Sequence, residues 1–398
     1  MNKLITGIGI GAATLLMLAA CASGGDQAEP DTSAPDTSSG DNTSSGDTNL
    51  GPDPDEALAA LASQVLSLGP NGESPQGFET TELTDAEVEQ IQAAGLSAAI
   101  VLHYGGNDWS AAQVEGLTSE FNRLGINIVA VTDANFRPEQ QVSDIETVLA
   151  LNPDIIVSIP TDPVATADAY AKARDAGVQL VFMDNVPAGF TGGEDYVSVV
   201  SADNKGNGVA SAHLMAKALG GEGTIALIYH DADFFVTKQR YEGFKETIQL
   251  YPGIEIVEEQ GIGGPDFAGD AQAAATAILT KNPDIDGIWG VWDVPAEGIM
   301  AAARDAGRTD LKIATQDLGT NVAIQLAKGE LIVGLGAQRP FDQGVAEARL
   351  GAAAAIGKTG LPIYVALGAL PVSSDNVVDM WKSVYSTDAP ADVLNAVQ

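Results

Sequence analysis

The sequence predicts an α/β protein made of two doubly wound lobes, each a parallel sheet covered by helices. One observation is that short β-branched segments alternate with Ala-rich amphipathic segments along most of the chain. Apolar strands that alternate with helices are typical of parallel sheets buried on both faces. The other is an internal repeat, because Asn-Pro-Asp-Ile at 152–155 recurs at 282–285 and Arg-Asp-Ala-Gly at 174–177 recurs at 304–307. Since both motifs recur at the same offset, we expect two lobes built on one plan.

Each lobe is expected to contain four strands, which are apolar segments bounded by turn-forming residues. The predicted strands are 97–104, 126–133, 154–160 and 179–184 in the first lobe, and 223–230, 254–261, 285–292 and 311–317 in the second. The predicted helices between them are 138–151, 164–176, 268–281 and 295–306. Before the first strand, 55–68 and 84–95 also have the apolar spacing of helices, and the sequence leaves their packing open.

The start of the chain has the order of a secretory signal. A lysine near the N-terminus is followed by an apolar stretch from Leu4 to Ala20. Leu-Ala-Ala-Cys at 18–21 resembles the lipobox of bacterial lipoproteins, in which the cysteine is lipidated and becomes the mature N-terminus. We therefore expect a signal peptide over 1–20, a lipid anchor at Cys21 and a folded part outside the cytoplasm. An uncleaved membrane anchor is the alternative.

The segment that follows is rich in Gly, Ser, Thr, Asp and Pro, so it cannot bury enough apolar surface to fold. We predict a disordered tether over 21–56 and a helical extension over 57–96. Cys21 is the only cysteine, so no disulfide is expected. The net charge of −35 argues against nucleic acid and anionic lipid surfaces as partners, because both are bound through basic patches.

Polar and aromatic side chains gather at the carboxyl ends of the predicted strands, where open α/β sheets bind ligands. Asp184 and Asp317 end the fourth strand of each lobe, and Trp292 ends the third strand of the second. Trp109 follows the first strand, and Arg240 lies near the start of a predicted helix. Indole rings pack on the C–H faces of sugars, while carboxylates and amides bond to hydroxyls. With one arginine in view, a neutral polyhydroxylated ligand is favoured over a phosphate.

Each of these residues also has a structural alternative. Trp109 and Trp292 can be core residues, Asp184 can cap a helix and Arg240 can form a surface ion pair. Their shared location at equivalent strand ends favours the binding role.

Six short motifs, in order, resemble those of type I periplasmic sugar-binding proteins of the ribose-binding group, which serve ABC importers. They are NDWSAAQVEG (107–116), VFMDN (181–185), RYEGF (240–244), VWD (291–293), TQDLG (315–319) and GLGAQRP (334–340), and the resemblance covers roughly 97–385. It implies a ligand site made of Asn107, Asp108, Trp109, Asp184, Asn185, Arg240, Trp292, Asp317 and Gln338. Asp266 and Phe267 are weaker candidates.

Three positions depart from the family pattern. Ser110 stands in place of an aromatic residue, Asn185 in place of an arginine and Trp292 in place of an asparagine. These departures leave a pentose, a hexose and a sugar alcohol all open as ligands.

The resemblance implies a three-strand hinge, with crossings near 202–203, 338–340 and 366–369. The N-terminal lobe would be 97–202 plus 339–367, and the C-terminal lobe 203–338 plus 368–398. It also implies a monomer without cofactor or metal that closes around its ligand and delivers it to an ABC permease. Such proteins are themselves the standard example of hinge closure.

Three other functions compete with this interpretation. A receptor that feeds a membrane sensor kinase or chemoreceptor would have the same fold, and the sequence does not separate it from a transport protein. A glycosidase needs a carboxylate pair at hydrolytic separation, and the three histidines have no ligand or catalytic spacing. The sensor half of a cytoplasmic repressor is disfavoured by the signal sequence and the missing DNA-binding segment.

Overall fold

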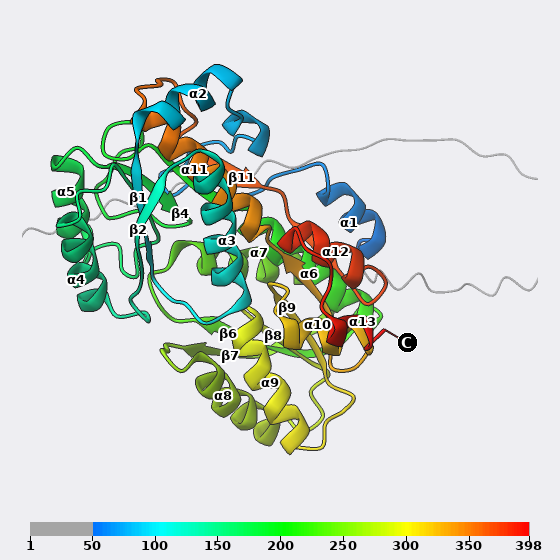
Figure 1. Cartoon of the computed structure of the whole chain (residues 1–398). Helices are drawn as coiled ribbons and strands as arrows, with labels where there is room; N and C mark the ends of the chain where they lie inside the picture. The colour runs from blue at the N-terminus through cyan, green and yellow to red at the C-terminus, as the bar shows by residue number, and fades with distance from the viewer. Residues whose placement is uncertain (1–50, 398) are drawn as a thin grey trace, which may run out of the picture. The chain divides into compact units, whose positions relative to one another are not determined.

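The computed structural model describes residues 51–397. The predicted signal peptide, Cys21 and most of the predicted tether lie outside the described residues. Within the described range, two six-stranded sheets form two lobes, each covered by helices (Figure 1). No helix between residues 51 and 397 is long and apolar enough to span a membrane.

The sheet of the first lobe has the strand order β11-β5-β4-β3-β1-β2, and all its pairs are parallel. Its strands are β1 (Ser97–Leu102), β2 (Asn127–Asp133), β3 (Ile155–Ser158), β4 (Gln179–Met183), β5 (Ser198–Ala202) and β11 (Tyr364–Leu367). Alternate strand residues point to opposite faces, so two apolar layers form. Helices α3 (Asp108–Arg123) and α11 (Pro340–Ala355) pack on one face, and α4 (Pro138–Leu149) and α5 (Ala167–Asp175) on the other (Figure 1).

The sheet of the second lobe has the order β12-β10-β9-β8-β6-β7, in which only the β10–β12 pair is antiparallel. Its strands are β6 (Glu222–His230), β7 (Gly253–Ile262), β8 (Gly287–Gly290), β9 (Lys312–Gln316), β10 (Ile332–Ala337) and β12 (Leu370–Val372). Helix α6 (Asn204–Leu219) packs on α7 (Phe235–Ile248), and α8 (Phe267–Lys281) packs on α9 (Asp293–Asp305). The remaining helices are α10 (Thr320–Ala327), α12 (Val377–Tyr385) and α13 (Ala391–Leu394).

The predicted α/β class with two doubly wound lobes is confirmed, and each predicted strand and helix between 97 and 317 has a counterpart. Each sheet has six strands rather than the four expected, because β5 and β11 complete the first sheet and β10 and β12 the second. The chain passes between the two sheets at three places: after β5, after β10 and between β11 and β12. Two of these passages are tied together, because the N–H of Asp203 donates to the carbonyl of Leu367 at 2.8 Å.

The helix predicted at 55–68 is shorter than expected and begins inside the predicted tether 21–56. Helix α1 runs over Pro54–Leu61, because the side chain of Asp53 caps its N-terminus and Pro54 occupies the first helical position. The second predicted helix is observed as α2 (Asp85–Ala94), after a short 3₁₀ turn at Phe78–Thr81.

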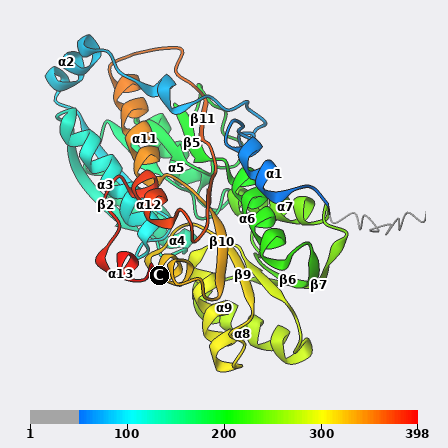
Figure 2. The ribbon, with the colours of Figure 1, turned by 90° about the vertical axis from the view of Figure 1, so that its right-hand side faces the viewer.

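After α1 the N-terminal extension runs along the junction of the two lobes. The N–H groups of Leu66 and Ser67 donate to the two carboxylate oxygens of buried Asp203, at 2.9 and 2.8 Å. Helix α1 packs against α6 of the second lobe (Figure 2). Gln76 then forms two backbone hydrogen bonds with β11 of the first lobe, of 3.0 and 3.1 Å. The extension therefore contacts both lobes and the hinge.

Candidate functional site

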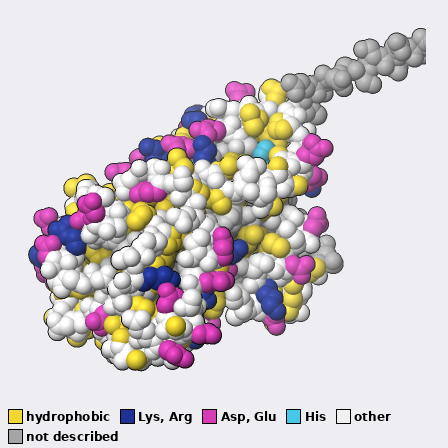
Figure 3. Space-filling model, turned by 90° about the horizontal axis from the view of Figure 1, so that it is seen from above, with side chains coloured by type: hydrophobic (Ala, Val, Ile, Leu, Met, Phe, Trp, Pro, Cys, Tyr) yellow, Lys and Arg dark blue, Asp and Glu magenta, His cyan; other side chains and the backbone are white. Residues whose placement is uncertain are grey.

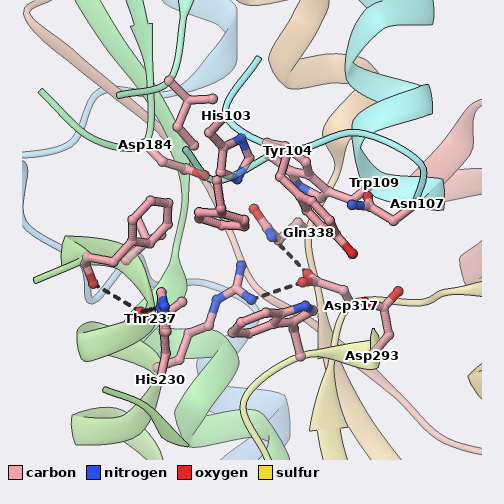
Figure 4. A pocket seen from close by; sticks show the side chains of 16 residues that line it. His103, Tyr104, Asn107, Trp109, Asp184, His230, Thr237, Asp293, Asp317 and Gln338 are labelled. Carbon is pink, nitrogen blue, oxygen red and sulfur yellow. Dashed lines mark hydrogen bonds and ion pairs between the residues drawn. The ribbon is translucent and has the colours of Figure 1, made fainter. Parts of the chain in front are cut away.

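A pocket lies between the carboxyl ends of the two sheets, and both lobes line it (Figure 4). The first lobe contributes His103, Tyr104, Asn107, Trp109, Phe136, Ile159 and Asp184; the second contributes His230, Phe234, Val236, Thr237, Arg240, Trp292, Asp293, Asp317 and Gln338. The cavity volume is about 60 Å³. One water needs ~10–15 Å³ on the same measure, so the pocket holds more than a single water.

A buried chain of polar side chains forms the floor of the pocket. The guanidinium of Arg240 donates to Oδ2 of Asp317 at 2.9 Å and to Oδ1 of Asn204 at 2.8 Å. The amide of Gln338 donates to Oδ1 of Asp317 at 2.8 Å (Figure 4). Both oxygens of Asp317 are thus occupied, and its carboxylate is held in one orientation.

The two carboxylates at the ends of the fourth strands share an unusual backbone conformation. Asp184 has φ of 56° and Asp317 has φ of 64°. This left-handed region costs an ordinary residue on the order of 1 kcal/mol or more. Each residue is held there by a bond from its own N–H to the neighbouring strand, at Val200 and Gly336 respectively. The repeat seen in the sequence thus places two carboxylates at equivalent points facing one cavity.

Burial sets the charge state of the titratable groups around the pocket. It raises the pKa of Asp184 to about 6, and the charge of Asp317 also raises it, while the bond from Ser201 and the charge of Arg240 lower it. Burial and the charge of Asp317 raise the pKa of Asp293 well above its usual range.

The two histidines at the pocket are neutral at ordinary pH. Burial, followed by the charge of His230, lowers the pKa of His103 to about 3. Burial, followed by the charge of Arg240, lowers the pKa of His230 to about 4 against the opposing effect of Asp231. Arg240 is therefore the cationic group among the side chains that line the pocket.

Aromatic rings from both lobes form the walls. Phe136 lies 4.7 Å from His103 within the first lobe and 5.1 Å from Phe267 of the second, centroid to centroid. Trp292 contacts Phe267 at 4.8 Å, and His103 stacks on Phe234 of the other lobe at 5.7 Å. The lobes are therefore in contact through aromatic rings around the cavity.

A sequence profile described as "Periplasmic binding protein domain" matches residues 98–359. The chain belongs to this family. The predicted resemblance to type I periplasmic sugar-binding proteins is confirmed.

Several relatives of this periplasmic binding protein are known from sequence. Ribose import binding protein RbsB of Escherichia coli is 23% identical over 228 residues, which are 57% of this chain and 74% of the relative. The D-apiose import binding protein of Actinobacillus succinogenes is 27% identical over 247 residues, which are 62% of this chain and 77% of the relative.

Solved structures give the same result for the fold. An ABC transporter solute-binding protein from Agrobacterium vitis, bound to α-D-tagatopyranose, is 25% identical with a TM-score of 0.67. The match covers 73% of this chain and 100% of that one. A second protein from the same organism, bound to allitol, is 26% identical with a TM-score of 0.64 and covers 72% and 98%.

Most of the residues predicted for the site of this periplasmic binding protein face the cavity. They are Asn107, Trp109, Asp184, Arg240, Trp292, Asp317 and Gln338. Asp108 and Asn185, which were also predicted, are not among the lining residues. Asp108 starts helix α3, and its carboxylate bonds to Thr320 of the other lobe. Asn185 directly follows Asp184 and is 4% exposed.

The two weaker candidates also lie outside the lining. Asp266 caps helix α8 by accepting from the N–H of Gly269, and Phe267 is fully buried behind Phe136 and Trp292.

The sequence interpretation missed several aromatic wall residues, notably His103, Phe136 and Phe234. All three follow strands at their carboxyl ends, so the strand-end rule that selected Asp184 applies to them as well. Among the described residues, no group of three or more His, Cys, Asp or Glu side chains has the arrangement of a metal site.

Proposed function

We propose that this periplasmic binding protein captures a neutral sugar or sugar alcohol between its lobes and delivers it to an ABC importer. One observation supports this most: the Arg240–Asp317–Gln338 chain of polar groups from one lobe faces Asp184 and Trp109 of the other across an aromatic-walled cavity. A polyol has hydroxyls along its length and apolar C–H faces, so it matches both kinds of surface.

Several polar atoms of the pocket have capacity left for a ligand. Within the described part of the chain, Nδ1 of His103, Nε1 of Trp109 and Oε1 of Gln338 form no hydrogen bond. Asp184 accepts from Ser201 through Oδ1 at 2.6 Å. The indole N–H can donate to a hydroxyl oxygen, and the amide oxygen can accept from a hydroxyl. Buried polar atoms cost free energy while unpaired, so ligand hydroxyls that pair with them gain affinity.

The relatives support the ligand class. Two relatives are import binding proteins for ribose and D-apiose, and two solved structures hold α-D-tagatopyranose and allitol, all of which are uncharged polyhydroxylated molecules. In this chain Arg240 is already paired with Asp317, so the site holds no unpaired cation for a phosphate. On the face drawn in Figure 3, Lys and Arg side chains lie among acidic ones and do not gather into a basic patch.

The wider setting belongs to the same proposal. The protein acts outside the cytoplasm as a monomer, is held to the membrane through Cys21 and binds its ligand without converting it. The same capture step serves a sensor kinase or chemoreceptor as well as an importer, and that role is the alternative function.

A thermal-shift screen of pentoses, hexoses and sugar alcohols tests the proposal. A ligand that binds only the folded state stabilises it by ~2.7 kcal/mol at a hundred times its Kd. We expect a concentration-dependent rise in Tm with at least one compound, and unchanged ligand when the mixture is analysed afterwards by chromatography. A protein that melts cooperatively but responds to no compound would contradict the sugar class, and chemical conversion of the ligand would contradict the binding-only role.

A further inference from the structure

One hydrogen bond joins the two lobes at the edge of the pocket, and neither of its residues lines the cavity. Oδ2 of Asp108, in the first turn of α3, accepts from the N–H of Thr320 at 2.6 Å. The two residues are 212 positions apart, and they belong to helices that pack on different sheets. Asp108 does not line the cavity, although its neighbours Asn107 and Trp109 do.

The bond pairs a backbone N–H group at the start of helix α10 that no side chain of its own segment caps. Helix α10 begins at Thr320, and its N-cap residue, Gly319, has no side chain to accept from the N–H groups of the first turn. A carboxylate at a helix N-terminus is stabilising because it pairs with free N–H groups and with the positive end of the helix dipole. Asp108 supplies this carboxylate from the opposite lobe.

The bond can exist only while the lobes are together. Opening of the hinge moves α3 away from α10, and the N–H of Thr320 then bonds to water. The capping interaction therefore stabilises the closed form alone. An interaction that differs between two conformations shifts their equilibrium by its own free energy, whichever ligand is bound.

We propose that Asp108 is a positioning residue that favours lobe closure by capping helix α10 across the cleft, and that it raises the affinity for every ligand by the same factor. This inference rests on the proposed function, in which the ligand is captured by closure. It assigns to Asp108 a role different from the direct ligand contact that the sequence predicted.

Four single variants and one double variant test the pair of atoms. Asp108→Ala removes the acceptor, and Asp108→Asn keeps an acceptor without the charge. Thr320→Pro removes the donor N–H at the first helical position, where proline fits, and the extended conformation of Gly319 (φ −62°, ψ 150°) suits a following proline. Thr320→Ala keeps the N–H and is the matched control.

Isothermal titration calorimetry would give the Kd of each variant for the polyols that shift Tm. We expect Asp108→Ala and Thr320→Pro each to weaken binding by roughly 2- to 30-fold, the range spanned by N-cap substitutions. Asp108→Asn should lie between the wild type and Asp108→Ala, and Thr320→Ala should match the wild type. The double variant Asp108→Ala/Thr320→Pro should be no weaker than the worse single variant, because both changes remove one bond.

A second measurement does not depend on knowing the ligand. Residues Ser119 of α3 and Ala277 of α8 are exposed, so spin labels can be attached to cysteines introduced there by Ser119→Cys and Ala277→Cys in a Cys21→Ser background. The distance between the labels reports the separation of the lobes without added sugar. We expect Asp108→Ala to shift the distance distribution towards longer values, and Thr320→Ala to leave it unchanged.

The outcomes separate the two proposals. If the wild type binds no polyol but Asp108→Ala still lengthens the distance, the proposed function fails and the closure role stands. If Asp108→Ala weakens different polyols by clearly different factors, Asp108 contacts the ligand and the closure role is wrong. Additive losses in the double variant, or a lobe separation that is the same in wild type and Asp108→Ala, would also overturn it.

Discussion

Arg240 and Asp317 form a buried ion pair at the centre of the pocket, with 2.9 Å between Nη1 and Oδ2 and side chains that are 5% and 9% exposed. Asn204 and Gln338 complete the pair, so each charged group has more than one partner. A buried pair contributes little net stability when intact, but removal of one partner leaves an unpaired charge in a water-poor site. The pair thus fixes the position of binding groups more than it stabilises the fold.

Asp317→Asn should therefore damage both binding and stability. We expect loss of measurable polyol binding and a decrease of about 3–5 kcal/mol in the free energy of unfolding, because Arg240 remains buried without its counter-ion. Urea unfolding and calorimetric titration check the two effects. Lys172→Ala is the control, since its pair with Glu146 is exposed and should change neither quantity. A stable Asp317→Asn protein would mean that the pair is less desolvated than its geometry indicates.

Asp184 predicts a pH dependence of stability. Its folded pKa of about 6 lies above the usual 3.8, so the folded state binds a proton more tightly than the unfolded state. By linkage, the resulting stabilisation of the folded state is complete below pH 4 and is lost as the pH rises through 6. Asp184→Asn should cancel this loss, which amounts to about 3 kcal/mol or less. Urea unfolding of wild type and variant at pH 4.5 and pH 7 checks it, and an equal pH response in both would contradict the assignment.

Trp109 predicts a specific contribution to affinity. Its ring packs beside His103 at 6.0 Å, and its Nε1 has no partner among residues 51–397. Trp109→Phe keeps a ring and removes the donor, so we expect weaker binding by about tenfold, the size of one hydrogen bond. The melting temperature of the ligand-free protein should be nearly unchanged. An unaltered Kd would show that the indole N–H does not reach the ligand.

The hydrogen bonds of Asp203 indicate that the N-terminal extension is part of the hinge. Its carboxylate accepts from Leu66, Ser67 and the first turn of α6 at Gly206, all within 2.9 Å. Asp203→Ala leaves these N–H groups without their partner, and we expect a loss of stability of about 3 kcal/mol or more. Hydrogen exchange should speed up at 66 and 67. Asp55→Ala, which removes only an exposed pair with Lys217, serves as the comparison.

The proposed lipid anchor predicts the location of the protein. Cys21→Ser removes the sulfur that would carry the lipid, so the protein should move from the membrane fraction to the soluble fraction on cell fractionation. Continued membrane association of the variant would favour the uncleaved anchor.

The sequence predicted the fold class and seven of the sixteen residues that line the pocket, because strands and their carboxyl ends can be located from local patterns. Alternation of apolar strands with helices is visible in short windows, and it requires parallel sheets whose carboxyl ends lie together. Asp184 and Asp317 could be selected because each directly follows a strand. Phe136 follows a strand as well, yet a phenylalanine is more often a core residue, and only its contacts with rings of both lobes reveal its position.

By itself the sequence determined two repeated α/β lobes and a set of polar groups at their strand ends. Only the tertiary structure decided which of these groups meet. The bond between Asp108 and Thr320 and the bonds from Leu66 and Ser67 to Asp203 join segments far apart in the chain. Such contacts depend on how one lobe packs against the other and on where the extension crosses the hinge, and neither is encoded in the spacing of neighbouring residues.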